Sequence, residues 1–179
     1  GDITRNSQMD EGNIYEALQE GWKHDLRNVW WVIDYNRQSL DGVVREGLFA
    51  RIEAIFAAFG WRVVRLKYGA LQRAAFAEPG GGALRDWIDA CPNQLYAALT
   101  YQGGAAWRKR LMADLGDQGP VSQLLDRRDD AALSTLMENL GGHCLASLCE
   151  AFDAAQDAVP TVFLAYTIKG WGTPLAGHK

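Results

Sequence analysis

One short run of residues constrains the fold of this chain more than any other. The run Asn28-Val-Trp-Trp-Val-Ile-Asp34 is almost continuously apolar and rich in β-branched and aromatic residues. Such a run is typical of a strand buried on both faces of a parallel sheet, because a half-exposed strand alternates polar and apolar residues. Two further runs, Trp61–Lys67 and Thr161–Ile168, also have the composition of strands.

Helical periodicity accounts for most of the remaining chain. Apolar residues recur every three or four positions in Gly12–Leu26 and from Val44 to Phe59, where Gly60 is suited to a left-handed cap. Because the second of these helices lies between two strands, we expect a right-handed crossover. The other helices are predicted over Ala70–Glu78, Ala83–Ala90, Gln94–Leu99, Ala105–Leu115, Pro120–Leu125 and Asp130–Leu140, with a last helix that Gly141-Gly142 opens.

These elements predict a single α/β domain over residues 1–179. We expect a partial doubly wound parallel sheet of about three recognisable strands, with helices on both faces. Residues 83–140 are interpreted as a mostly helical insertion between strands, and residues 1–8 as an atypical N-terminal segment. A chain of 179 residues is long enough for one sizeable core.

Composition and charge argue against several classes of protein. Apolar residues make up 48% and charged residues 22%, which is ordinary for a globular protein and not for a disordered one. The net charge of −4 argues against nucleic-acid binding, because such proteins concentrate Lys and Arg on one face. No apolar run has the length of a membrane helix, and the polar start does not resemble a signal peptide. The three cysteines are irregularly spaced, so we expect reduced thiols in the cytoplasm rather than disulfides or a zinc site.

Two loops are candidates for a ligand site, since ligands of a doubly wound sheet bind beyond the carboxyl ends of its strands. The first loop is Asp34–Asp41 and the second is Lys169–Gly172. Asn36 has an amide oxygen and Gln38 a backbone carbonyl for magnesium, which prefers hard oxygen ligands, and Lys169 can neutralise a phosphate. By composition alone, the first loop is more typical of a plain connection between strand and helix, and a lysine after a strand is usually solvated.

The histidines and cysteines indicate no catalytic residue. His143 is interpreted as a cap or surface residue at a helix start, His24 as solvated, and His178 as part of a frayed end. Cys144 and Cys149 are five positions apart, which favours a role in helix packing. No hydrolase, zincin, Rossmann or phosphate-loop signature occurs in the sequence.

Several segments resemble the cofactor domain of transketolase-like enzymes. Within that group, the chain most resembles the thiamin-diphosphate-binding domain of the homodimeric pyruvate dehydrogenase decarboxylating component, in which a strand ends in an Asn-x-Gln-x-Leu-Asp-Gly loop. Here Asn36–Gly42 has this pattern, after Met9–Leu18 and Asn28–Asp34. Later segments agree in order, namely Phe59–Trp61, Gly104–Arg108, Gly141–His143 and Thr167–Gly172. The resemblance covers nearly the whole chain from Met9 onward and indicates a domain that is truncated at both ends.

The resemblance implies thiamin diphosphate bound through magnesium between two subunits. In the family the metal ligands are an Asp of a Gly-Asp-Gly turn, the loop Asn and a main-chain oxygen, and Asn36 and Gln38 match the last two. Aligned without a gap, the turn falls on residues 5–8, which places Asn6 at the carboxylate position, while Asp2 is the alternative at a greater separation. An amide at that position leaves magnesium one anion short.

The resemblance also implies parts and partners outside this chain. The family has the strand before the Gly-Asp-Gly turn upstream and the aminopyrimidine partner domain downstream, so we do not expect this chain alone to turn over a 2-oxo acid. It further implies a homo-oligomer and, for the parent enzyme, the lipoyl-bearing acyltransferase component as a partner.

The alternative function is an inert or repurposed oligomerisation or interaction module that binds no cofactor. The strand at Val29–Ile33 belongs in the middle of a sheet, so the loss of an upstream neighbour leaves an apolar edge that must be paired or covered. We expect either self-association or a rearranged N-terminus to cover this edge.

Overall fold

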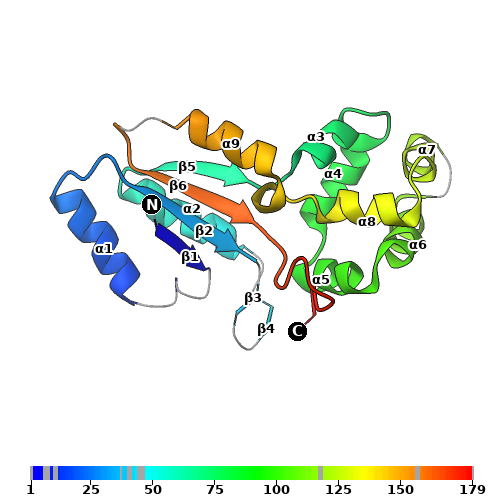
Figure 1. The fold of residues 1–179 in the computed structure, drawn as a ribbon, viewed down its shortest axis with the longest axis horizontal. Coiled ribbons are helices and arrows are strands. Elements are labelled where there is room, and N and C mark those ends of the chain that lie inside the picture. Colours follow the sequence, from blue (N-terminus) through cyan, green and yellow to red (C-terminus); the bar gives the residue numbers. More distant parts are fainter. Residues whose placement is uncertain are drawn as a thin grey trace.

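A computed structural model of the chain describes residues 2–5, 9, 12–36, 38–39, 42–43, 47–116, 119–155 and 158–178, with the backbone alone for residues 2–5, 38–39 and 42–43. The predicted α/β class is confirmed, because parallel strands form one sheet and helices pack on both of its faces (Figure 1). Within the described ranges, none of the helices has the length and apolar character needed to cross a membrane.

The sheet contains four parallel strands in the order β1-β2-β6-β5. Their bounds are Asp2–Arg5 for β1, Trp30–Tyr35 for β2, Arg62–Leu66 for β5 and Thr161–Tyr166 for β6. The three strands that the sequence predicts are all present, and β6 lies between β2 and β5. The crossover from β2 to β5 therefore spans the position of β6. A small antiparallel hairpin, β3 (Gln38–Ser39) with β4 (Gly42–Val43), follows β2.

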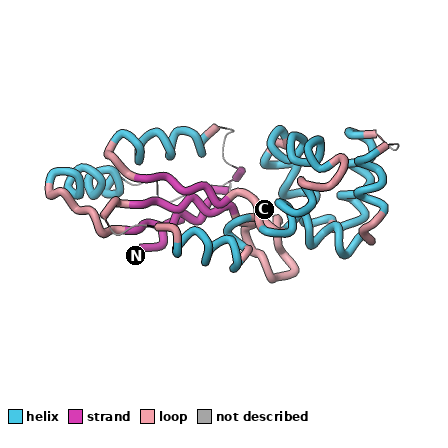
Figure 2. The backbone as a smooth tube through the Cα atoms, turned by 90° about the horizontal axis from the view of Figure 1, so that it is seen from above, coloured by secondary structure: helices cyan, strands magenta, loops and turns pink. Residues whose placement is uncertain are grey.

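Alternating residues of the central strands are buried against different helices on the two faces of the sheet. On one face, Ile33 and Val162 belong to the core cluster that includes Ile52 and Phe56 of α2 (Leu48–Ala58). The helix α1 (Gly12–Lys23) contributes its buried Leu18 to the same cluster. On the other face, Phe163 packs with Phe152 of α9 (Leu145–Asp153). Figure 2 shows α2 and α9 on opposite sides of the strands. The strand buried along its whole length is β6, whereas in β2 only Ile33 and Tyr35 are fully buried and the other residues are half-buried.

The remaining helices form a group beside the end of the sheet to which the strands point (Figure 1). They are α3 (Ala70–Phe76), α4 (Gly81–Ala90), α5 (Asn93–Gln102), α6 (Gly104–Leu115), α7 (Pro120–Asp126) and α8 (Asp130–Glu138). Trp107, which is fully buried, packs edge-on against Tyr96 at the centre of this group. Each predicted helix is present with its ends shifted by a few residues. All six helices lie between β5 and β6 in the chain, although these two strands are neighbours in the sheet.

The segment Gly141–His143 corrects the prediction for the last helix. It forms a short 3-10 turn, η2, and α9 begins only at Leu145. Backbone packing explains the separate turn, because a Cβ atom at Gly141 would lie 2.2 Å from the carbonyl oxygen of Leu66. The turn is therefore pressed against the end of β5.

The strand β1 corrects one expectation about the N-terminus and decides between two alternatives stated for the edge of β2. The strand preceding the metal-binding turn was expected outside this chain, but β1 pairs in parallel with β2 and ends at Arg5, directly opposite Asp34. The apolar edge of β2 is consequently covered within the chain, which is the rearranged N-terminus of the two possibilities stated above. Asn6 itself lies outside the described residues.

Candidate functional site

The carboxyl ends of β2 and β6 meet at one rim of the sheet and enclose a pocket there. Tyr35 and Tyr166 are paired across the two strands, so Asn36 and Lys169 follow from the same edge. A pocket of about 380 Å³ opens at this rim, and both predicted residues line it. The full lining is Asp34, Asn36, His143, Thr167, Ile168, Lys169, Gly170 and Trp171.

Gln38 lies in the hairpin beyond β2, and Asp2, one of the two proposed carboxylate positions, begins β1. Gln38 lies in β3 and pairs with Val43, so its main chain is part of the hairpin that follows the rim. That its carbonyl oxygen faces the pocket stays a prediction. Asp2 is excluded from the rim by topology, because it begins β1 opposite Trp31 and lies three strand residues, about 10 Å at the usual rise, before Arg5.

The carboxylate of Asp34, which lines the same pocket as Asn36, already has a partner. Asp34 is half-buried and accepts a hydrogen bond from the hydroxyl of Thr167. The backbone N–H of Thr167 in turn donates to the carbonyl of Tyr35 at 3.2 Å, which extends the pairing of β2 and β6 by one step. These contacts fix the strand ends from which Asn36 and Lys169 emerge.

His143 is placed at the rim by the glycine turn before it. A Cβ atom at Gly142 would lie 2.6 Å from the carbonyl oxygen of Tyr166, so only glycine allows this approach to β6. The His143 ring accepts a hydrogen bond at Nε2 from the backbone N–H of Ile168, at 2.7 Å, and stacks on Trp171 with ring centroids 4.3 Å apart. The interpretation of His143 as a cap or surface residue is therefore wrong. The two consecutive glycines were the signal in the sequence that the chain approaches another backbone here.

The loop that carries Lys169 is also held from the side of the helical group. Gly177 donates its N–H to the carbonyl of Lys169 at 3.0 Å, and a Cβ atom at Gly177 would lie 2.5 Å from the carbonyl oxygen of Ala97 in α5. The ring of His178 packs edge-on against Tyr101 at 4.8 Å. The fraying expected of His178 stays a prediction, and its ring contact lies at the far end of this loop. The loop is folded back onto α5, and the Lys169 side chain is exposed to solvent.

The described residues offer donors for a phosphate more clearly than for a metal. Lys169 supplies a positive charge and Asn36 an amide at the same pocket. Among the residues that the structure describes, no three His, Cys, Asp or Glu side chains are grouped as metal ligands would be. The fit to magnesium therefore depends on Asn36, on a main-chain oxygen and on a diphosphate to supply anionic oxygens.

The cysteines and His24 lie away from this pocket. Cys144 is buried at the start of α9, and its Sγ accepts a hydrogen bond from the N–H of Ala70 at 3.2 Å. Burial raises the pKa of this thiol, but hydrogen bonds from Ser147 and Ala70 outweigh it and leave the pKa below its usual value. Cys149 is exposed, so a packing role is wrong for this residue. His24 has 73% of its side chain exposed, as expected for a solvated residue.

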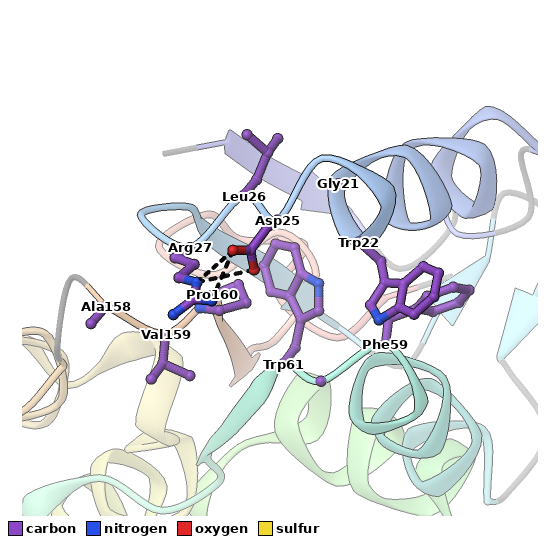
Figure 3. A pocket seen from close by; sticks show the side chains of 11 residues that line it. Gly21, Trp22, Asp25, Leu26, Arg27, Phe59, Trp61, Ala158, Val159 and Pro160 are labelled. Carbon is purple, nitrogen blue, oxygen red and sulfur yellow. Dashed lines mark hydrogen bonds and ion pairs between the residues drawn. The ribbon is translucent and has the colours of Figure 1, made fainter.

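A second pocket, of about 330 Å³, lies at the opposite end of the sheet (Figure 3). Aromatic side chains of Trp22 and Trp61 line it, and the carboxylate of Asp25 faces the guanidinium of Arg27 at 2.8 Å. Asp25 has a positive φ of 49° because it ends α1 as a left-handed cap, with its N–H donating to Trp22 and that of Leu26 donating to Gly21. This pocket is at the amino ends of β5 and β6, where ligands of such sheets seldom bind.

A third pocket, on the β5 side of the rim, is rich in charge but electrically balanced. Three cations line it, and each has its own carboxylate partner. The pairs are Arg65 with Glu53, Lys67 with Asp89, and Arg73 with Glu150. The pocket between β2 and β6 therefore remains the best candidate for a ligand site.

Comparison with known proteins confirms the resemblance predicted from the sequence. No protein-family model matches the chain. The chain is 27% identical over 178 residues to the pyruvate dehydrogenase E1 component of Corynebacterium glutamicum, which covers 97% of this chain and 18% of that protein. Proteins of the same name from Mycobacterium tuberculosis and Escherichia coli are 29% and 28% identical over 170 and 171 residues, with 93% of this chain covered in each case. The chain spans only 18–19% of the length of these relatives.

Proposed function

We propose that this chain, whose relatives over nearly its full length are pyruvate dehydrogenase E1 components, forms part of the thiamin diphosphate site of a 2-oxo acid dehydrogenase. The observation that supports this best is the shared pocket of Asn36 and Lys169. The sequence predicts both residues as cofactor contacts, and they follow different strands, β2 and β6. The ends of these strands are distant in the chain, because the hydrogen-bonded residues Asp34 and Thr167 are 133 residues apart. Pyruvate is the substrate suggested by the names of the relatives.

In this proposal each residue has a separate role in holding the diphosphate. Lys169 neutralises a phosphate as a point charge. Asn36 would hold a magnesium ion through its amide oxygen, and Gln38 through its main-chain oxygen. When bound, thiamin diphosphate supplies the carbanion chemistry of decarboxylation, and the protein supplies orientation. Because the chain spans about a fifth of its relatives, turnover is proposed for the whole enzyme and not for this segment alone.

Calorimetric titration with thiamin diphosphate and magnesium tests this proposal. We expect binding to the unaltered chain and a loss of about tenfold or more in affinity for Lys169→Ala, since a hydrogen bond to a charged group contributes roughly 1.5–3 kcal/mol. Lys109→Ala is the matched control, because Lys109 is an exposed lysine of α6 and is not among the residues lining the pocket. The proposal fails if the unaltered chain gives neither heat nor a thermal shift, or if the two variants bind equally.

A second candidate function is an interaction module, and one surface feature favours it. Trp22 is 65% exposed beside the pocket that Trp61 lines, an unusual position for so large an apolar side chain. A homo-oligomer, or binding of the lipoyl-bearing acyltransferase component, would use such a surface. Under this reading, light scattering shows association that Trp22→Ser abolishes and Lys169→Ala leaves intact. A constant monomer mass over a wide concentration range excludes self-association.

A further inference from the structure

We infer that His143 is a positioning residue, whose imidazole holds the loop that presents Lys169 to the pocket. The inference rests on the proposed function only for the identity of the ligand, a diphosphate. The geometry of the loop itself depends on contacts of described residues alone.

The first of these contacts is a hydrogen bond to the backbone N–H of Ile168, which lies beyond the last paired residue of β6. Ile168 is 6% exposed, and its N–H follows the last paired residue of β6 by two positions. An unpaired N–H at such a buried position is costly. The ring nitrogen Nε2 of His143 accepts this N–H at 2.7 Å. Because Nε2 accepts, a neutral imidazole at this position carries its proton on Nδ1.

The second contact holds the same loop on its far side. The His143 ring lies nearly parallel to Trp171, with an angle of 14° between the ring planes. Lys169 and Gly170 are thus bracketed by two residues that both touch one imidazole. Gly170 has a φ of 72°, which lets the chain turn sharply between these two contacts. Consequently, the direction in which Lys169 leaves the sheet is set by a side chain from a different segment.

The His143 ring is itself anchored to the sheet. The N–H of Gly141 donates to the carbonyl of Lys67 at 3.0 Å, which ties the turn η2 to the end of β5. The backbone of Gly142 lies directly against Tyr166, the last residue of β6, and against Thr167, which follows β6. Because the turn is held against the sheet, the position of His143 is fixed by the sheet, and the loop is held in turn by His143.

Two substitutions separate a positioning role from a general structural one. His143→Ala removes both the acceptor and the ring, whereas His143→Gln places an amide oxygen where Nε2 was and so can still accept from Ile168. We expect His143→Ala to weaken thiamin diphosphate binding by about fivefold to tenfold, as for the loss of one hydrogen bond. His143→Gln restores most of the affinity. His24→Ala, at an exposed histidine far from the pocket, leaves binding unchanged.

Two spectroscopic readouts keep the inference testable without a bound ligand. In the full chain, hydrogen exchange of the Ile168 amide accelerates in His143→Ala and not in His143→Gln. The fluorine signal of Trp171 in protein labelled with fluorotryptophan, assigned by its loss in Trp171→Phe, shifts in both variants because the stacked ring is gone. Failure of the unaltered chain to bind would reject the proposed function, yet these two readouts would still decide the role of His143. The inference is overturned if the Ile168 amide and the Trp171 signal are the same in His143→Ala as in the unaltered chain. It is also overturned if His143→Gln loses as much affinity as His143→Ala.

Discussion

At the scale of single residues, the rim of the sheet depends on glycines that have no room for a side chain. Gly141 and Gly142 lie against the backbone of β5 and β6, and they bring His143 to the strand ends. A residue of any other type would force these elements apart, because a Cβ atom would lie 2.2 Å from the carbonyl oxygen of Leu66 at Gly141 and 2.6 Å from that of Tyr166 at Gly142, and main-chain oxygens cannot rotate away. The pocket therefore requires glycine, which has no Cβ atom, at both positions, in addition to Lys169.

Replacement of Gly141 by alanine tests this close packing. We expect Gly141→Ala to lower the free energy of unfolding by about 1–3 kcal/mol, the usual cost of overpacking. Gly82→Ala is the control, because no atom lies within 4 Å of a Cβ at this position in α4. It should stabilise the chain slightly, by about 0.4–1 kcal/mol. Urea denaturation measures both, and equal destabilisation by the two substitutions would contradict the proposed packing.

Sequence reasoning placed Asn36 and Lys169 at the rim but did not place His143 there, and the reason is physical. Residues that directly follow a buried strand must emerge at a rim, so strand prediction alone places Asn36 and Lys169 there. The position of His143 depends on a turn that docks through its backbone onto β5 and β6, a tertiary contact that has no periodic signal. Only the pair of glycines before it hinted at this contact.

At the scale of elements, ion pairs join helices that are distant in sequence. Glu78, which follows α3, accepts hydrogen bonds from Arg128, which follows α7. The hydrogen bond from Arg128 holds the pKa of the Glu78 carboxyl below its usual value, against a smaller opposing effect of burial. The pair therefore connects two corners of the helical group.

This lowered pKa makes a testable contribution to stability. A carboxyl whose pKa is lower in the folded chain stabilises it above the unfolded pKa, about 4.3, and this contribution disappears as the pH falls through the folded pKa. We expect Glu78→Gln to reduce the free energy of unfolding by roughly 0.2–1 kcal/mol at pH 6, with a smaller reduction below pH ~4. Chemical denaturation at several pH values measures this difference. A pH-independent difference would show that charge is not its cause, and Glu16→Gln on the exposed side of α1 serves as the control.

The sequence predicted the helices and three strands well but did not predict β1. Helices and buried strands leave a repeating pattern of apolar residues, because each must bury one face or both. The strand β1 has only four residues, Asp-Ile-Thr-Arg, with one large apolar side chain among them. It becomes a strand because the edge of β2 offers unpaired backbone groups, which is a property of its neighbour and not of its own sequence.

At the scale of the whole molecule, β1 closes one edge of the sheet. Removal of residues 1–5 would leave the backbone of β2 unpaired on that side. We expect the shortened chain to have a lower denaturation midpoint than the full chain and a mass in light scattering that rises with concentration. Removal of Gly1 alone is the control, since β1 begins at Asp2. Unchanged mass and midpoint in the shortened chain would mean that β1 does not protect this edge.

At this scale, three of the segments that carry the family resemblance contribute residues to the rim pocket. They are Asn28–Asp34, Gly141–His143 and Thr167–Gly172. The segment Phe59–Trp61 lies at the opposite end of the sheet, and Gly104–Arg108 lies in α6. The helical group is held together by its own buried residues, such as Trp107 and Leu133, and its arrangement beside the rim was not predictable from helical periodicity.

The placement of the helices α3 to α9 between two adjacent strands has a consequence for how the chain reaches this structure. β6 follows β2 and β5 in the chain, yet it lies between them in the sheet. Its hydrogen bonds join residues of large separation along the chain, and contacts of that kind form slowly because long loops must close first. We therefore expect the amides of local helices to be protected from hydrogen exchange early in refolding. We expect β2 and β5 to remain unpaired until β6 inserts between them and completes the rim.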